Sequence, residues 1–87
     1  MTTSAIDADA QARIKELVCD VLELEEDEVS NDSLFKEDHG ADSLRAIEIL
    51  AGLEKEFKIT IDQTELERMV NLDGVYAVVG EAIAAGA

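Results

Sequence analysis

Apolar residues recur at helical spacing through the first quarter of the chain. They share one face at intervals of three or four residues: Ile6, Ala10, Ile14, Leu17, Val18 and Val21. Asp7 and Asp9 place negative charge where the amino end of a helix favours it. The pattern predicts a first helix that ends near Leu24, after a frayed start over residues 1–5.

Helical periodicity is lost between Glu25 and Asp42, where acidic and polar residues dominate. A connection of this length in a small domain must be pinned to the core. We therefore expect its three large apolar side chains to act as anchors: Val29, Leu34 and Phe35. Residues 32–35 could form one helical turn within this predicted loop.

A second helix is predicted to start at Ser43 and to run to about Phe57. Asp42 stands at the N-cap position, where its carboxylate can accept from an unpaired backbone amide. One side of the helix is apolar and should be buried: Ala46, Ile49, Leu50, Leu53 and Phe57. The opposite side should face solvent, with Ile47 on its shoulder: Leu44, Glu48, Ala51 and Lys55.

The segment from Ile59 to Ile61 alternates for too few residues to build a sheet, so its two isoleucines are expected to pack on the helices. Asp62 then opens a predicted short third helix, with Glu65 at the reciprocal position of a capping box. The apolar side of this helix would be formed by three residues: Leu66, Met69 and Val70.

Asn71 is the predicted cap of the last helix, and Gly86 its end. Its apolar stripe consists of Leu72, Val75, Val79, Ala82 and Ile83. Together these elements predict an all-α fold, a small four-helix bundle with three longer helices, a short third helix and a long loop between the first two. Residues 1–87 are expected to form a single domain.

The charge of the chain narrows its possible partners. Twenty-one acidic residues face seven basic ones, which gives a formal net charge of -14 over 87 residues. Such a field disfavours nucleic acid and anionic membranes as partners and favours proteins with basic docking patches. The alternative interpretation is that the acidity serves solubility alone.

The single cysteine, Cys19, cannot form an internal disulfide. It projects away from the apolar stripe of the first helix, so we expect it to be partly exposed and unreactive. No apolar run approaches the length needed to cross a bilayer, and no signal-peptide pattern begins the chain. We therefore expect a cytoplasmic, monomeric protein.

Ser43 is the residue with the most suggestive local chemistry. A phosphate esterified to a serine at a helix amino end would be stabilised by free amides and by the helix dipole. Ser43 as an ordinary first-turn residue remains the alternative. A hydrolase that uses His39 as a base would need an orienting group and an oxyanion site. No zinc-binding cluster or EF-hand spacing occurs in the sequence, so no metal site is predicted.

The segment from Phe35 to Leu44, which ends in Gly-Ala-Asp-Ser-Leu, resembles the attachment motif of acyl carrier proteins. The downstream Leu53-Glu-Lys-Glu-Phe57 segment stands at the matching offset, and the similarity covers nearly the whole chain. The resemblance implies that Ser43 carries 4'-phosphopantetheine, transferred from coenzyme A by a phosphopantetheinyl transferase. The thiol of that arm would hold acyl groups as thioesters, and the chain itself would not be an enzyme.

The same resemblance implies roles for neighbouring residues. Asp42 and Leu44 match the positions beside the attachment serine. The helix that docks basic surfaces of an acyltransferase, a ketosynthase or other pathway enzymes would use Leu44, Ile47, Glu48, Ala51 and Glu54. His39, Arg45, Lys55 and Asp62 depart from the usual pattern, which favours a specialised polyketide or hybrid pathway over housekeeping fatty acid synthesis.

Three other functions stay open at this point. The motif form is less typical of peptidyl or aminoacyl carriers, which more often have a second glycine and a histidine before the serine. A noncovalent acidic adaptor would use the same exposed helix without modification of Ser43. A calcium-responsive acidic protein is the third alternative, through the carboxylates between Glu25 and Asp42.

Overall fold

The structure is a computed structural model that describes residues 7–86, so the predictions for Ile6 and for residues 1–5 lie outside it. Its elements in chain order are α1 (Ala8–Leu22), η1 (Glu26–Glu28), α2 (Phe35–His39), α3 (Ser43–Phe57), η2 (Gln63–Arg68) and α4 (Leu72–Gly86). The elements marked η are 3₁₀-helices. No strand occurs in the described part of the chain, and the predicted all-α class is confirmed.

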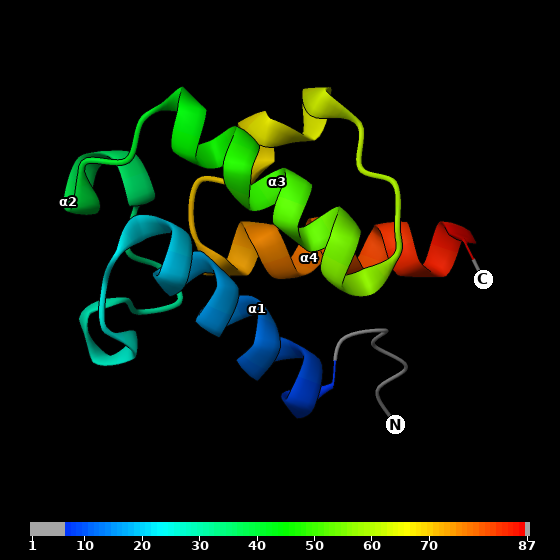
Figure 1. The fold of residues 1–87 in the computed structure, drawn as a ribbon, viewed down its shortest axis with the longest axis horizontal. Coiled ribbons are helices and arrows are strands. Elements are labelled where there is room, and N and C mark those ends of the chain that lie inside the picture. Colours follow the sequence, from blue (N-terminus) through cyan, green and yellow to red (C-terminus); the bar gives the residue numbers. More distant parts are fainter. Residues whose placement is uncertain (1–6, 87) are drawn as a thin grey trace.

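The three long helices surround one core, with η2 closing one side (Figure 1). α1 and α3 are antiparallel neighbours. Arg45 at the start of α3 donates to the Val21 carbonyl at the end of α1. At the other end of the pair, Arg13 near the start of α1 pairs with Glu56 near the end of α3. Side chains of every long helix fill the core, and the most completely buried are Ile14, Val18, Val29, Ile49, Leu53, Leu72, Val75 and Val79.

The predicted helix caps Asp42 and Asn71 are present, and Asp7 also caps a helix, at a point where only favourable negative charge was predicted. The carboxylate of Asp7 accepts from the Ala10 amide at 2.8 Å, and that of Asp42 accepts from the Arg45 amide at 3.1 Å. The side-chain oxygen of Asn71 accepts from the Gly74 amide at 2.8 Å. Each bond satisfies an amide that has no partner within its own helix.

The segment between α1 and α3 is more ordered than a plain loop. Val29 and Phe35 are buried as predicted, whereas Leu34 is half-buried. The helical turn predicted over residues 32–35 is wrong in position, because α2 starts at Phe35. Residues 30–33 form a turn closed by the Ser33 hydroxyl, and Asp38 bonds the Leu34 amide at 2.7 Å, which starts the helix after that turn.

The prediction for residues 59–70 is partly right. Ile61 and Met69 are buried, and Ile59 and Leu66 are half-buried, as expected. The third helix is a 3₁₀-helix in which the Asp62 carboxylate accepts from the Thr64 amide. Two details were wrong. Glu65 forms an ion pair with Arg68 instead of closing a capping box, and Val70 is 47% exposed.

Cys19 is only 4% exposed, so the predicted partial exposure is wrong. The chain reverses after α1 at Glu23, which has a φ of 58°, and the Leu24 amide then bonds the Cys19 carbonyl at 2.9 Å. This reversal returns the chain over the side of α1 that carries Cys19. Burial raises the pKa of the thiol, with a further contribution from Glu26, which keeps the group uncharged.

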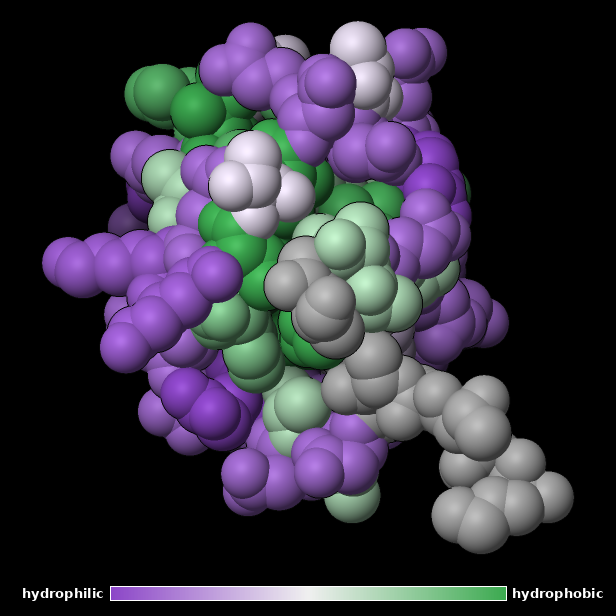
Figure 2. Space-filling model, turned by 90° about the vertical axis from the view of Figure 1, so that its right-hand side faces the viewer, coloured by the Kyte–Doolittle hydropathy of each residue, from purple (hydrophilic) through white to green (hydrophobic). Residues whose placement is uncertain are grey.

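Apolar side chains also reach the surface at the end of the bundle remote from Ser43. Phe57, Ile59, Ala82 and Ile83 line a hollow of about 540 Å³ between the end of α3, the segment after it and the end of α4. Figure 2 views this end and shows green apolar residues surrounded by purple hydrophilic ones.

Candidate functional site

Ser43 is the first residue of α3 and is exposed. The preceding chain positions it in two steps. Gly40 ends α2 in the left-handed region, with a φ of 69° that glycine adopts without strain. Asp42 then caps α3 with both its backbone carbonyl, which accepts from the Ala46 amide, and its carboxylate. The predicted helix start at Ser43 is confirmed.

The hydroxyl of Ser43 is free among the residues that the structure describes, unlike the hydroxyls of the other two serines in that part of the chain. Ser30 donates to the Asp32 carboxylate at 3.0 Å. Ser33 donates to the Ser30 carbonyl at 3.1 Å and lies 3.1 Å from His39. The amides of Ser43 and Leu44 also have no partner within the helix, because they belong to its first turn. Of the three serines in the described residues, Ser43 is therefore the one whose exposed hydroxyl forms no hydrogen bond within the chain.

The structure does not pair His39 with Ser43. His39 ends α2, is half-buried, and has its Nε2 atom 3.1 Å from the Ser33 hydroxyl. It therefore does not occupy the position of a general base for Ser43. Between residues 7 and 86, no three potential metal-ligating side chains converge.

A small cavity lies beside Ser43, between α2, α3 and η2. Its volume is about 170 Å³, roughly the space of five or six water molecules. Apolar side chains form most of its wall, including Phe35, Ile49, Leu66 and Met69, with Lys36 and Glu37 at its edge. Sequence reasoning missed this cavity, because its wall comes from three separate elements.

The exposed face of α3 consists of Leu44, Ile47, Glu48, Ala51 and Lys55. Leu44 is 63% exposed and Ile47 is 42% exposed, so the predicted exposure of this face is confirmed. Glu54 differs from the other predicted docking residues, because it is half-buried and its carboxylate accepts from the Ile61 amide at 2.8 Å. That bond ties the segment after α3 back onto the helix.

Arg45 joins the start of α3 to the end of α1. Its guanidinium donates to the Val21 carbonyl at 2.9 Å and to the Glu23 carboxylate at 3.2 Å, and it lies 3.5 Å from the Glu48 carboxylate. A cation at this point also interacts favourably with the carboxyl end of α1. The positive charge of Arg45 therefore lies between the end of α1 and Glu48 on the exposed face of α3.

Comparison with known proteins gives a consistent result. The family described as "Phosphopantetheine attachment site" matches residues 12–79, which is most of the chain. Polyketide-8 synthase acyl carrier protein 1 of Streptomyces avermitilis is 66% identical over 80 residues, covering 92% of this chain and 95% of that protein. Polyketide-8 synthase acyl carrier protein 2 of the same organism is 43% identical over 75 residues, covering 86% and 83%.

Two further matches are more distant. An acyl carrier protein of Petrotoga mobilis is 34% identical over 71 residues, covering 82% of this chain and 84% of that protein. A chain in the solved structure named "The ishigamide ketosynthase/chain length factor" superposes with a TM-score of 0.75 at 32% identity, covering 90% of this chain and 99% of that one. That chain is therefore about as long as this one.

A small helical domain with an accessible serine at the start of a helix, matched by a phosphopantetheine attachment family, is a carrier and not a catalyst. The chain belongs to the acyl carrier proteins, among those of polyketide pathways. It carries acyl intermediates on a covalently attached 4'-phosphopantetheine arm, and it has no catalytic activity of its own. Within residues 7–86, no helix is long and apolar enough to cross a membrane.

Proposed function

We propose that Ser43 is the attachment residue and that the whole chain acts as one carrier domain. The observation that carries this proposal is the free, exposed hydroxyl of Ser43 at the start of a fifteen-residue helix. The arm comes from coenzyme A and is transferred by a separate phosphopantetheinyl transferase, so the chain needs only to present the hydroxyl. Once the phosphodiester forms, the first-turn amides and the dipole of α3 stabilise its negative charge.

Asp42 and Leu44 support Ser43 in different ways. Asp42 holds the first turn of α3 through the bond to the Arg45 amide. Leu44 offers an exposed aliphatic side chain next to the hydroxyl, which partner enzymes contact. The apolar cavity beside Ser43 has room for only a few carbon atoms, so it is too small to enclose a long carried chain.

The exposed face of α3 is the main contact surface for the pathway enzymes, including a ketosynthase. Leu44, Ile47 and Ala51 provide an apolar contact, with Glu48 at its edge. The similar chain in a structure named for a ketosynthase and chain length factor supports a partner of this kind. Glu54 contributes through its bond to the Ile61 amide more than through direct docking.

The two Streptomyces relatives support a specialised polyketide pathway as the setting, in preference to fatty acid synthesis or a hybrid assembly line. We place the chain in the cytoplasm, where coenzyme A is available, and we expect it to be a monomer. The single buried thiol of Cys19, which has no internal disulfide partner, is compatible with a reducing compartment.

The test is an intact-mass measurement after incubation with coenzyme A, magnesium and a phosphopantetheinyl transferase of broad specificity. We expect the wild-type chain to gain one arm, Ser43→Ala to gain none, and the matched control Ser33→Ala to gain one. A Ser43→Ala chain that still takes the arm would overturn the assignment. A wild-type chain that stays unmodified with several transferases would favour the noncovalent adaptor.

A further inference from the structure

The carboxylates of α3 are all engaged within the chain. Glu48 pairs with Arg45, and Glu54 accepts from the Ile61 amide. Glu56 accepts from Arg13, whose guanidinium also stacks 5.1 Å from the centre of the Phe57 ring. With Arg45 and Lys55 as its cations, α3 has three acidic and two basic residues, a formal charge of -1. The exposed face of this helix therefore has three apolar residues, and the charges of Glu48 and Lys55 on it cancel.

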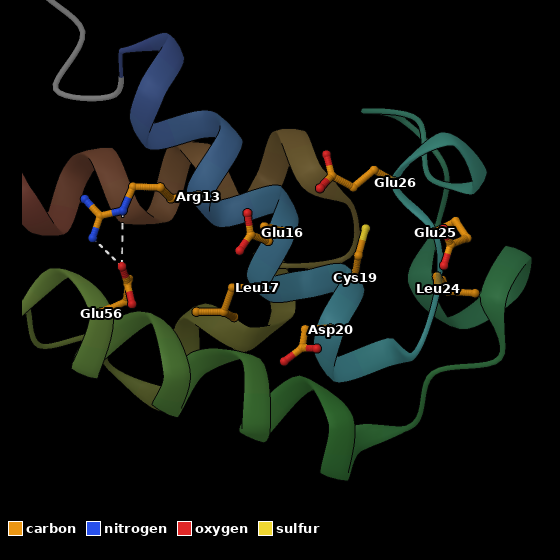
Figure 3. Close-up of a pocket in the computed structure, with 9 residues that line it drawn as sticks. All are labelled: Arg13, Glu16, Leu17, Cys19, Asp20, Leu24, Glu25, Glu26 and Glu56. Atoms are coloured by element: carbon orange, nitrogen blue, oxygen red, sulfur yellow. Dashed lines mark hydrogen bonds and ion pairs between the residues drawn. The ribbon is translucent and has the colours of Figure 1, made fainter.

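A groove of about 600 Å³ runs along α1, and in contrast to the exposed face of α3 it is strongly acidic. We name it the α1 groove. The lining residues that matter for the argument below are Glu16, Leu17, Asp20, Leu24, Glu25 and Glu26. Figure 3 shows the Arg13–Glu56 pair bridging α1 and α3 at one end, with Leu24, Glu25 and Glu26 at the other. Leu17 and Leu24 are half-buried and give the groove an apolar floor.

Most carboxylates of the α1 groove form no ion pair with the described residues. Five acidic residues line it and one of them, Glu56, pairs with Arg13, the single cation of the lining. The remaining four form no ion pair with any residue between 7 and 86, and all four are exposed: Glu16, Asp20, Glu25 and Glu26. Four uncompensated charges around an apolar floor are complementary to a basic surface that presents an aliphatic side chain.

The α1 groove is continuous with the exposed face of α3. Gly52 lies between the two, and Leu17 packs directly over it, at 3.3 Å from where a Cβ atom would be. No side chain at position 52 therefore separates the two surfaces. A partner that covers Leu44, Ile47 and Ala51 reaches α1 past Glu48, and at Gly52 it meets no side chain.

We infer that the α1 groove is a second docking surface, which receives the lysine- and arginine-rich part of a partner enzyme while the exposed face of α3 makes the apolar contact. The inference rests on the proposed function, since the partner is an enzyme that acts on Ser43 or on its arm. The carboxylates of α1, together with Glu25 and Glu26, steer the basic surface of the partner toward the groove. Glu48 contributes less to this steering, because Arg45 already compensates its charge.

The probe is a phosphopantetheinyl transferase, whose reaction on Ser43 gives a KM for the carrier chain and a kcat. The variant Glu16→Gln with Asp20→Asn removes two charges from the α1 groove. The matched control Glu67→Gln with Asp73→Asn removes two exposed, unpaired charges from η2 and α4. Both pairs change the net charge equally, so the control measures the effect of the overall field.

At about 50 mM salt we expect the α1 pair to raise KM about fivefold with kcat unchanged, and the control pair to raise it less than about twofold. The difference should shrink at about 500 mM salt, where screening is strong. Equal KM values for the two pairs, or a larger effect of Glu48→Gln than of the α1 pair, would overturn the inference. A wild-type chain that takes no arm would overturn the proposed function itself, which is a separate and recognisable result.

Discussion

Asp42→Ala tests how α3 presents Ser43. The substitution removes the carboxylate that accepts from the Arg45 amide at 3.1 Å and leaves that first-turn amide without a protein partner. Losing an N-cap of this kind costs about 1 kcal/mol of stability, within a range of about 0.5–2 kcal/mol. For a domain of 87 residues this corresponds to a decrease in melting temperature of about 4–8 °C.

The measurement combines urea unfolding, followed by the helical circular dichroism signal, with the rate at which Ser43 takes the arm. Because the first turn of α3 holds Ser43, we expect Asp42→Ala to lower that rate as well as the stability. Asp42→Asn keeps a side-chain oxygen at the cap, so it should retain most of both properties. Asp7→Ala is the matched control, since it removes a cap bond of 2.8 Å from α1, remote from the site.

Two results would refute this reasoning. The first is a wild-type rate of modification in Asp42→Ala at temperatures where the chain is folded, because the cap would then not position Ser43. The second is an equal loss of rate in Asp7→Ala, because the effect would then follow from general destabilisation. If Asp42→Asn lost as much rate as Asp42→Ala, the negative charge and not the cap would be the essential property.

Three more outcomes are expected. Gly74→Ala should lower the unfolding free energy by about 2–3 kcal/mol in urea unfolding, because its Cβ would lie 2.0 Å from the Arg68 carbonyl, whereas Gly52→Ala should change it by less than about 1 kcal/mol. Arg68 lowers the pKa of the Glu81 carboxyl from its ordinary 4.5, so this ion pair stabilises the fold above pH 4.5, and the stabilisation is lost as the pH falls and Glu81 is protonated. In thermal melts, Arg68→Met should therefore make the stability depend less on pH in the acid range. Leu44 is 63% exposed, so Leu44→Ala should change the unfolding free energy by less than about 0.5 kcal/mol while raising the KM of the transferase reaction; a marked loss of stability would place Leu44 in the core.

The parts of the site that could be predicted depend on local rules. Asp42 stands directly before an apolar period of 3.6 residues, which fixes the helix start and leaves Ser43 in its first turn. The same period separates the buried Ile49 and Leu53 from the exposed Leu44 and Glu48. Position along one helix was sufficient for both conclusions.

The parts that could not be predicted depend on contacts between distant segments. Arg45 bonds the Val21 carbonyl, 24 residues earlier, and no spacing rule relates the two. Cys19 is buried because the chain reverses at Glu23, a residue type that rarely adopts a positive φ and so gave no turn signal. The role of Glu54 depends on where the segment carrying Ile61 returns, which tertiary packing decides.

The central claim is that Ser43 carries the arm on which acyl groups travel. Its most direct test is fragmentation mass spectrometry of the chain isolated from its native host, with the phosphopantetheine and any attached acyl group localised to a single residue. The account predicts that both are found on the peptide that contains Ser43, with Ser30 and Ser33 unmodified. An arm located on Ser30 or Ser33, or acyl groups bound to the chain by any route other than the arm, would contradict it.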